Sequence, residues 1–198
     1  MSLFASKGFK GTTTRAIACA AGVSEAIIFR HFATKEDLYD AIINYTVEKR
    51  TEQWQKDESI YNENQDLTTL LNTFAQTFVK RNREDTTFIR LMMYSALEDH
   101  KFREKFFAIH RSPWLKAIRK TIEEGKLDGT VRPVDAGLTT SAFFYALLQY
   151  CITNIVAKTD PPDPLRDEAL ISNLVSIFAR GLQPLHNDLT LSQTITLP

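Results

Sequence analysis

The sequence is poor in residues that cross-link or interrupt a chain. Its 198 residues include 2 cysteines, 7 glycines and 7 prolines. Cys19 and Cys151 are far apart and make neither a disulfide framework nor a paired metal site, and Cys19 is most simply a small core residue. Strand patterns are nearly absent, whereas helix-capping signals are frequent. These features exclude a disulfide-stapled module and favour an all-α fold with a substantial core.

Motifs that carry catalysis are missing as well. The sequence contains no Ser-His-Asp context, HExxH, P-loop or dinucleotide-binding glycine motif. Glu98, Asp99, His100 and His110 are conceivable metal ligands, but adjacent residues on a helix point in different directions, so a charged helix surface is expected. We therefore predict that the protein is not an enzyme and uses neither a metal nor a cofactor.

One segment is apolar enough to be compared with a membrane span. Residues 136–157 contain no charged side chain, and the segment is long enough to cross a bilayer. Polar residues interrupt it, however, and Lys158 and Asp160 follow. Because no signal peptide is visible either, we expect a cytoplasmic protein without a membrane segment.

The net charge is zero, but the charges are unevenly distributed. Residues 1–35 carry a net charge of +4, and the remainder carries −4. A basic N-terminal segment on an acidic body is typical of a DNA-binding protein with a separate domain for another task.

Residues 13–32, TTRAIACAAGVSEAIIFRHF, have the pattern of a helix-turn-helix. Either threonine at the start can cap a first helix, and Gly22 stands where that helix stops, because glycine adopts a left-handed conformation at little cost. Ser24 can cap a second short helix that runs to about Phe32. Such a second helix fits the major groove, so the segment predicts DNA binding.

A longer set of motifs surrounds this segment. It consists of Gly8-Phe9, Thr13-Thr14, Ile17-Ala18, Ala21-Gly22-Val23-Ser24, Phe29-Arg30-His31-Phe32 and Lys35-Glu36-Asp37-Leu38. In this register the run from Gly8 to Ile42 resembles the N-terminal domain of the TetR/AcrR family, over less than a fifth of the chain. The resemblance implies an all-α protein with an N-terminal helix-turn-helix domain and a larger helical domain for ligand binding and dimerisation.

Three positions depart from that family's pattern. Ala26 stands where glycine is usual, which favours helix and adds a methyl group that can touch a thymine methyl. Phe29 replaces the usual tyrosine, so the hydroxyl expected on a phosphate is missing. Residues 1–7 match only the last turns of the family's first helix, so either residues before Met1 complete it or the helix is short.

The DNA contacts follow from the helix positions and from the resemblance. Base readers are expected at the start of the second helix, nearest the bases: Glu25, Ala26, Ile27 and Arg30. Contacts to the DNA backbone are expected near helix ends: Thr13, Thr14, His31 and Lys35. His31 is alternatively a cap of its own helix, and Ser24 and Phe29 complete the predicted DNA-binding set.

The remaining chain is a series of predicted helices with caps. Thr34 and Asp37 form a capping box for a helix to about Asp57, whose distal part we expect to be solvated. Further helices are expected over 66–83, 86–110, 112–129 with Gly125 and Gly129 at the end, 135–158 and 163–182. We predict a DNA-binding domain over residues 1–45, a ligand-binding and dimerisation domain over 46–186, and a tail over 187–198.

The middle of the chain is rich in aromatic residues and methionine, which suit an apolar ligand pocket with few polar groups. The predicted lining is Phe74, Phe78, Met92, Met93, Phe106, His110, Trp114, Phe144 and Gln149. A plain core role is the alternative for each aromatic residue. The identity of the small-molecule effector is not readable from these residues.

The last two helices, about 135–158 and 165–182, carry more apolar surface than a small core needs. Because one recognition helix reads only a few base pairs, we expect a homodimer through these helices on palindromic double-stranded DNA. Completion of the monomer core is the alternative. The sequence therefore predicts a transcriptional regulator, a repressor released from its operator by a small, largely apolar ligand. The alternative is a helical adaptor or small-molecule-binding protein whose helix-turn-helix no longer binds DNA.

Overall fold

The computed structural model describes residues 1–56, 65–98, 112–159, 161 and 163–184, and within these ranges the elements are all helical. They are α1 (Ser2–Lys7), α2 (Thr14–Ala21), α3 (Glu25–His31), α4 (Lys35–Lys56), α5 (Leu67–Glu84), α6 (Thr87–Leu97), α8 (Pro113–Asp128), α9 (Ala136–Tyr150), the π-helix η3 (Cys151–Val156) and α10 (Pro164–Gly181). The predicted all-α fold is confirmed. Among these helices none is long and apolar enough to span a membrane.

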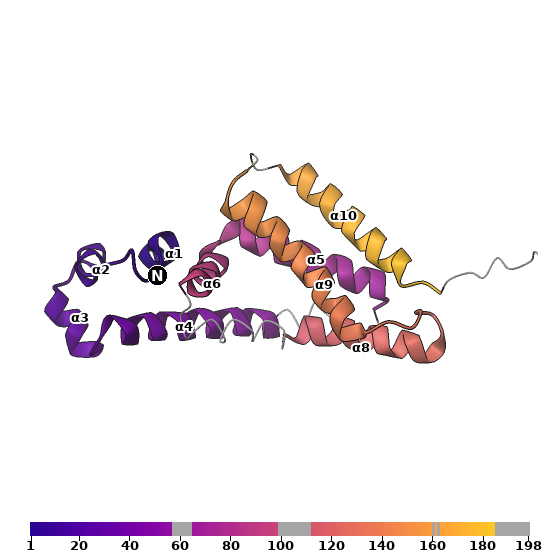
Figure 1. The fold of residues 1–198 in the computed structure, drawn as a ribbon, viewed down its shortest axis with the longest axis horizontal. Coiled ribbons are helices and arrows are strands. Elements are labelled where there is room, and N and C mark those ends of the chain that lie inside the picture. The colour runs from indigo at the N-terminus through magenta and orange to yellow at the C-terminus, as the bar shows by residue number, and fades with distance from the viewer. Residues whose placement is uncertain (57–64, 99–111, 160, 162, 185–198) are drawn as a thin grey trace, which may run out of the picture.

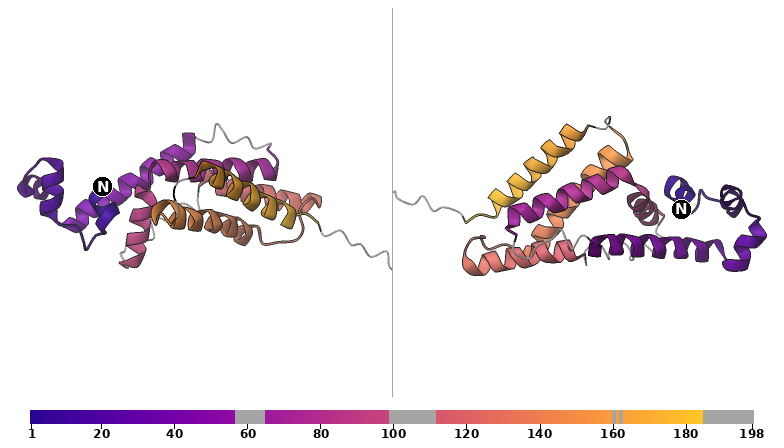
Figure 2. Two further views of the ribbon diagram at one scale, coloured as in Figure 1. Left: turned by 90° about the horizontal axis from the view of Figure 1, so that it is seen from above. Right: turned by 180° about the vertical axis from the view of Figure 1, so that it is seen from behind.

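The helices form two parts joined by α4 (Figure 1). Helices α1, α2 and α3 lie together at one end of the molecule and are called the N-terminal group below. Helices α5, α8, α9 and α10 form the body, where α10 and α8 pack on α5 and α9 packs on α8. Helix α6 packs on α1, and the three views place it between the N-terminal group and the body (Figure 2). Helix α4 runs without a break past the predicted domain boundary after residue 45.

Side chains cap the starts of several helices through short-range hydrogen bonds. Thr13 Oγ1 accepts the N–H of Ala16 at 3.1 Å. At the start of α4, the N–H of Asp37 donates to Thr34 Oγ1 and the N–H of Thr34 donates to Asp37 Oδ2, both at 3.0 Å. The side chains at the starts of the body helices also accept from the first turn: Asp66, Ser112, Asp135 and Asp163. Gly22 ends α2 in the left-handed conformation at φ 67°.

The sequence prediction was wrong about three helix boundaries. The single helix expected over 86–110 is not formed, because α6 ends at Leu97 and Glu98 leaves helical geometry at ψ 4°. Residues 99–111, with Asp99, His100, Phe106 and His110, lie outside the described residues. Gly125 lies inside α8, where a Cβ atom would come within 2.5 Å of Val131, and Gly129 ends that helix. The helix expected over 135–158 changes to π geometry after Tyr150.

Three predicted side-chain environments also need correction. Ser24 occupies the N-cap position of α3, but its side chain makes no capping hydrogen bond. Cys19 is exposed on α2 instead of packing in a core. The distal part of α4 is not simply solvated, because Trp54 is buried and Arg50 is half-buried where α4 packs against the body.

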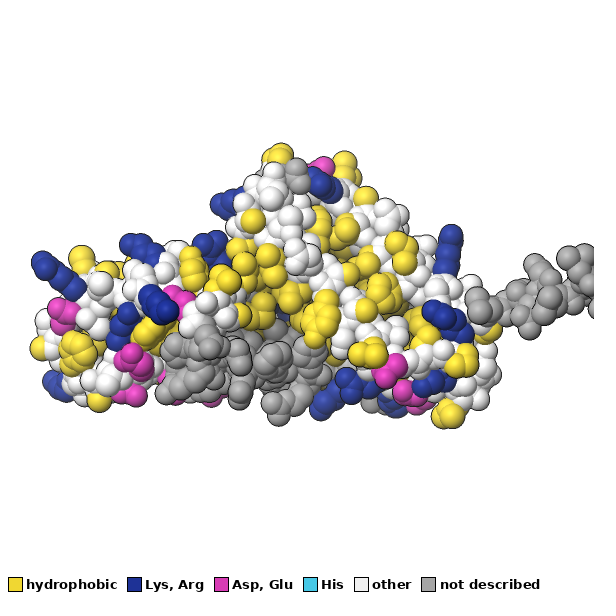
Figure 3. All heavy atoms as spheres, in the orientation of Figure 1, with side chains coloured by type: hydrophobic (Ala, Val, Ile, Leu, Met, Phe, Trp, Pro, Cys, Tyr) yellow, Lys and Arg dark blue, Asp and Glu magenta, His cyan; other side chains and the backbone are white. Residues whose placement is uncertain are grey.

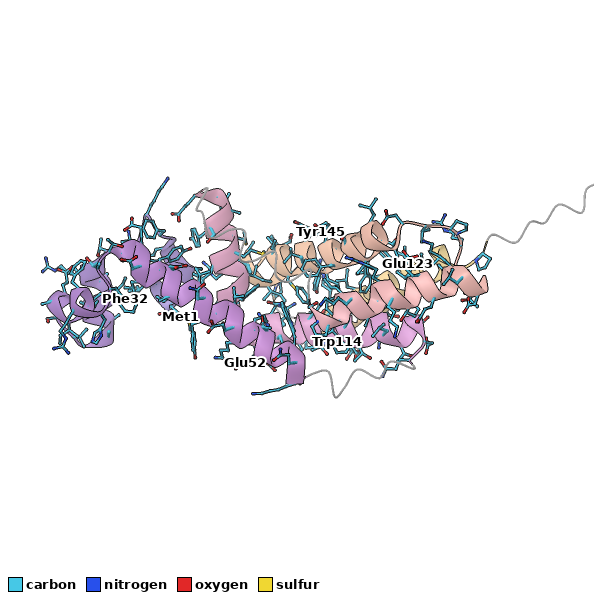
Figure 4. All side chains as sticks on the ribbon, turned by 90° about the horizontal axis from the view of Figure 1, so that it is seen from below. Met1, Phe32, Glu52, Trp114, Glu123 and Tyr145 are labelled. Carbon is cyan, nitrogen blue, oxygen red and sulfur yellow. The ribbon has the colours of Figure 1, made fainter. Side chains whose placement is uncertain are left out.

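Aromatic rings fill the centre of the body. The ring of Phe74 lies 5.8 Å from that of Phe78, 6.1 Å from Trp114 and 6.3 Å from Phe143, measured between centroids. Phe74, Trp114 and Phe143 are all buried. Trp114 and Tyr145, labelled in Figure 4, lie on different helices of the body, and Phe32 lies with the N-terminal group.

Candidate functional site

Helix α3 presents most of its surface to solvent at the far end of the N-terminal group (Figure 1). Ile28 is its one buried residue and anchors it to the core. The side chains predicted to contact DNA lie on the free surface and are exposed: Ala26, Ile27, Phe29, Arg30 and His31. A short helix held by one buried anchor and free on its other sides has the shape that enters a major groove.

Two predicted DNA contacts bind each other. The hydroxyl of Thr14, in the first turn of α2, donates a 2.6 Å hydrogen bond to Oε1 of Glu25, in the first turn of α3. This bond joins the two helices of the helix-turn-helix across the turn at Gly22. Oε1 of Glu25 therefore already accepts one hydrogen bond, and the carboxylate keeps acceptor capacity on its two oxygens for a base.

Three of the predicted contacts to the DNA backbone, Thr13, Thr14 and Lys35, lie near the starts of helices, and His31 is the last residue of α3. Thr13 uses its oxygen to cap α2, so only its hydroxyl hydrogen remains to reach a phosphate. Lys35, the first residue of α4, places Nζ 4.2 Å above the ring of Phe9. The cation–π contact orients the ammonium group beside the N-terminal group without neutralising its charge.

The end of α6 is tied to the N-terminal group by hydrogen bonds to backbone atoms. Oε2 and Oε1 of Glu98 accept the N–H groups of Phe9 and Lys10 at 2.9 and 3.0 Å. Arg90 Nε donates to the carbonyl of Ala5 at 2.6 Å, and the hydroxyl of Tyr94 donates to the carbonyl of Ser6 at 2.9 Å.

The same contact zone includes a buried side-chain pair. The hydroxyls of Tyr39 on α4 and Ser95 on α6 lie 3.0 Å apart, and burial raises the pKa of Tyr39. Because α6 meets both α1 and α4, a displacement of α6 has direct contacts through which to reach the DNA-binding helices.

The body contains an apolar cavity between α4, α5, α6, α8 and α9, called the aromatic cavity below. It is lined by Arg50, Trp54, Phe74, Thr77, Phe78, Arg81, Asn82, Phe88, Ile89, Met92, Trp114 and Leu148. Its volume is about 20 Å³, room for about one water molecule.

Four residues predicted for a ligand pocket line this cavity: Phe74, Phe78, Met92 and Trp114. Three others do not. Met93 packs against the core, and Phe144 is buried with its ring centroid 5.5 Å from that of Phe78. Gln149 is exposed and donates to Thr153 Oγ1 at 3.0 Å. The sequence pattern does not tell which side of a buried helix faces a cavity, so it did not separate Met93, Phe144 and Gln149 from the four residues that line this one.

Sequence reasoning also missed part of the lining. Arg50 and Trp54 lie in the stretch of α4 that was expected to be solvated, and Arg81 and Asn82 lie near the end of α5. The available signal was the tryptophan itself, a large apolar side chain one turn after Arg50 in an otherwise polar stretch.

Apolar side chains remain exposed on the two helices predicted to dimerise. Leu138 and Tyr145 on α9 are exposed, as are Leu165 and Ile177 on α10. Hydrophobic side chains gather on the face that carries α9 and α10 (Figure 3). No cluster of three or more potential metal-ligating side chains occurs among residues 1–56, 65–98, 112–159, 161 and 163–184.

Both parts of the chain match known protein families. Residues 1–42 match the bacterial regulatory proteins of the tetR family, and residues 65–181 match the C-terminal domain of AefR-like transcriptional repressors. A stretch of 44 residues is 48% identical to the uncharacterized HTH-type transcriptional regulator YvkB of Bacillus subtilis (strain 168), covering 22% of this chain and 23% of YvkB. The chain thus spans less than a quarter of the length of that relative.

Solved structures share the fold over almost the whole chain. The TetR family regulator PfmR from Thermus thermophilus is 22% identical with a TM-score of 0.65, over 92% of this chain and 96% of PfmR. FadR from Bacillus subtilis, in complex with stearoyl-CoA, is 17% identical with a TM-score of 0.69, over 92% and 95%. AibR, in complex with isovaleryl coenzyme A and operator DNA, is 21% identical with a TM-score of 0.66, over 89% and 91%.

The helix-turn-helix at one end, the helical body with its aromatic cavity and the matches to both parts lead to one conclusion. The chain belongs to the TetR family of DNA-binding transcriptional regulators.

Proposed function

We propose that the protein is a repressor that binds a palindromic operator as a homodimer and leaves it when a small, largely apolar ligand enters the aromatic cavity. The position of α6 carries the proposal. Phe88 and Met92 of α6 line the cavity, whereas Arg90 and Tyr94 of α6, and Glu98 directly after it, hold the N-terminal group. One helix therefore contacts both the proposed ligand site and the proposed DNA-binding part.

The size of the cavity supports a coupling between the two. Its volume is about 20 Å³, whereas ligand pockets usually measure about 300–1,000 Å³. A ligand must therefore displace the cavity wall, which includes α6. Since a ligand shifts an equilibrium only when it binds one state more tightly, it favours the expanded arrangement and weakens the one shown in Figure 1.

The required energy is modest. A tenfold loss of operator affinity corresponds to about 1.4 kcal/mol of coupling, within the usual range of about 1–3 kcal/mol. AibR, which shares this fold, was solved with both isovaleryl coenzyme A and operator DNA, and FadR was solved with stearoyl-CoA. A ligand site beside a DNA-binding part is therefore compatible with the fold.

The recognition surface we propose is the free side of α3. Glu25, Ala26, Ile27 and Arg30 read bases, and Thr13, Thr14, His31 and Lys35 contact the DNA backbone. Because a single α3 reads only a few base pairs, two copies are needed for useful specificity. The exposed apolar side chains of α9 and α10 supply the interface between the copies.

A gel-shift assay on the DNA upstream of the protein's own gene tests the proposal. The account expects a retarded complex that persists at physiological salt and is reduced by members of a panel of lipophilic compounds. If no duplex is bound with sequence preference, the protein is instead an adaptor or small-molecule-binding protein that has lost DNA binding.

A further inference from the structure

A second cavity adjoins the aromatic cavity and shares two arginines with it. Arg50, Arg81 and Phe88 line both cavities. The second cavity, called the cationic cavity below, has a volume of about 90 Å³ and lies between Met1, α4, the end of α5 and the start of α6. Lys49 adds a third cation to its lining. The apolar interior of the body therefore opens toward a cluster of positive charge.

The opposing charges of the cationic cavity lie toward solvent. Its lining includes Glu84 and Asp85, which are both exposed, whereas Arg50 and Arg81 are half-buried. The two arginines are thus the charged groups nearest the apolar interior, and the carboxylates mark the outer rim.

The positive charge of Arg50 is only weakly compensated by the groups around it. Its guanidinium lies 4.9 Å from the ring centroid of Phe88, and Nη2 makes a long hydrogen bond of 3.5 Å to Oδ1 of Asn82. Burial, followed by the charge of Arg81, lowers the pKa of Arg50 to about 10, while Asp85 opposes the shift. Two neighbouring cations in a partly buried site repel each other, so an anion that binds both lowers the free energy of the site.

We infer that the effector is an amphipathic anion whose acidic head binds Arg50 and Arg81 and whose apolar tail lies among Phe74, Phe78 and Trp114. The head is a carboxylate or a phosphate, because the planar guanidinium fork matches both. The inference rests on the proposed ligand site. An anionic head group also explains why two arginines line both cavities, which a purely apolar ligand does not explain.

The chain carries its own probe for this site. Its 2 tryptophans, Trp54 and Trp114, both line the aromatic cavity, so intrinsic fluorescence reports ligand entry without any DNA. The full-length protein is titrated with four ligands that share one tail: octanoate, octyl phosphate, 1-octanol and octylamine. We expect the tighter of the two anions to bind about tenfold or more tightly than 1-octanol, and octylamine to bind weakest. The tighter anion identifies the head group as a carboxylate or a phosphate.

Arg81→Met and Lys80→Met form a matched pair on α5, because each removes one positive charge and Lys80 is exposed and outside both cavities. In Arg81→Met the anion and 1-octanol should bind with about equal affinity, whereas Lys80→Met should keep the preference for the anion. Arg81→Lys keeps the positive charge and should retain a smaller preference for the anion over 1-octanol. This variant separates loss of the anion site from loss of folding. Thermal unfolding of each variant checks folding directly.

Three results would overturn the inference: binding of 1-octanol as tight as that of the anions, equal effects of the two methionine variants, or binding of none of the four ligands. Failure of the anion to release DNA overturns the proposed repressor switch instead, since the fluorescence titration contains no DNA.

Discussion

Oε2 of Glu98 accepts a 2.9 Å hydrogen bond from the backbone N–H of Phe9, a residue 89 positions earlier in the chain. Oε1 of the same carboxylate accepts the N–H of Lys10 at 3.0 Å. Glu98 follows α6 directly, and residues 9 and 10 lead from α1 to α2. One side chain therefore connects the end of α6 to the segment that leads into the helix-turn-helix.

Glu98→Gln should weaken this connection. The amide keeps one acceptor oxygen and turns an NH₂ group toward a backbone N–H, so one of the two hydrogen bonds is lost at a cost of about 1–3 kcal/mol. We expect the ligand-dependent change in operator affinity, measured by fluorescence anisotropy, to fall from about tenfold to about threefold or less. Glu48→Gln, an exposed change on α4, is the control and should leave the change intact.

Glu25→Ala should alter the sequence preference of the protein in a binding-site selection. A carboxylate accepts from the amino group of cytosine, and its removal should cost about 1–3 kcal/mol of discrimination at one base pair. Thr14→Val is the comparison variant, because it removes the 2.6 Å bond between the helices and the proposed backbone contact of Thr14 but leaves the carboxylate in place. It should weaken all duplexes alike without a change in sequence preference. If both variants weaken all duplexes alike, Glu25 is a structural tie between α2 and α3 and not a base reader.

Asp167→Asn should destabilise the body in a pH-dependent way. Asp167 on α10 accepts bonds of 2.7 and 2.8 Å from Arg83 on α5, and the hydroxyl of Tyr150 donates to it as well. The hydrogen bonds from Arg83 lower the pKa of Asp167, so the stabilisation is complete above the unfolded-state value of about 4 and is lost as the pH falls through the lowered folded-state value.

Urea unfolding at pH 7 should show a loss of roughly 1.5–3 kcal/mol in the free energy of unfolding for Asp167→Asn. The difference from the wild type should shrink as the pH falls below about 4. Glu168→Gln, on an exposed neighbour, should have little effect at either pH. A difference for Asp167→Asn that is constant with pH would show that the ionised carboxylate is not its source.

Ile177→Glu should separate the proposed homodimer. Ile177 is 67% exposed on α10, and a charge buried between two copies without a partner opposes association. Sedimentation velocity should show a shift toward monomer, with operator affinity lower by about tenfold or more. Leu127→Glu, at a leucine 89% exposed on α8, should remain dimeric. If both variants remain dimeric, the interface between the copies lies elsewhere.

The sequence predicted the features that depend on neighbouring residues. The caps at Thr13, Asp66, Ser112 and Asp163 are formed as expected, because a cap involves only the next two or three residues. For the same reason Gly22 marks the end of α2 correctly. The N-terminal motifs also placed the chain in its family.

Features that depend on contacts distant in the chain were missed. The charged residues around Arg50 indicated a solvated helix end. Trp54 was the one local signal against this, and it does not show that α5 and α6 cover the helix there. The contact of Glu98 with Phe9 and the cavity shared by Arg50 and Arg81 arise only when α4, α5 and α6 are brought together. A rule based on spacing along one helix cannot find them.

The ligand switch is tested by the operator affinity of the wild-type protein, measured with and without a ligand that occupies the aromatic cavity. Fluorescence of Trp54 and Trp114, which line the cavity, shows that the ligand is bound there. Anisotropy of a labelled duplex from upstream of the protein's own gene gives both values at one salt concentration. The account predicts that saturating ligand weakens binding about tenfold, and that the duplex weakens ligand binding by the same factor. A ligand that fills the cavity and leaves operator affinity unchanged would contradict it.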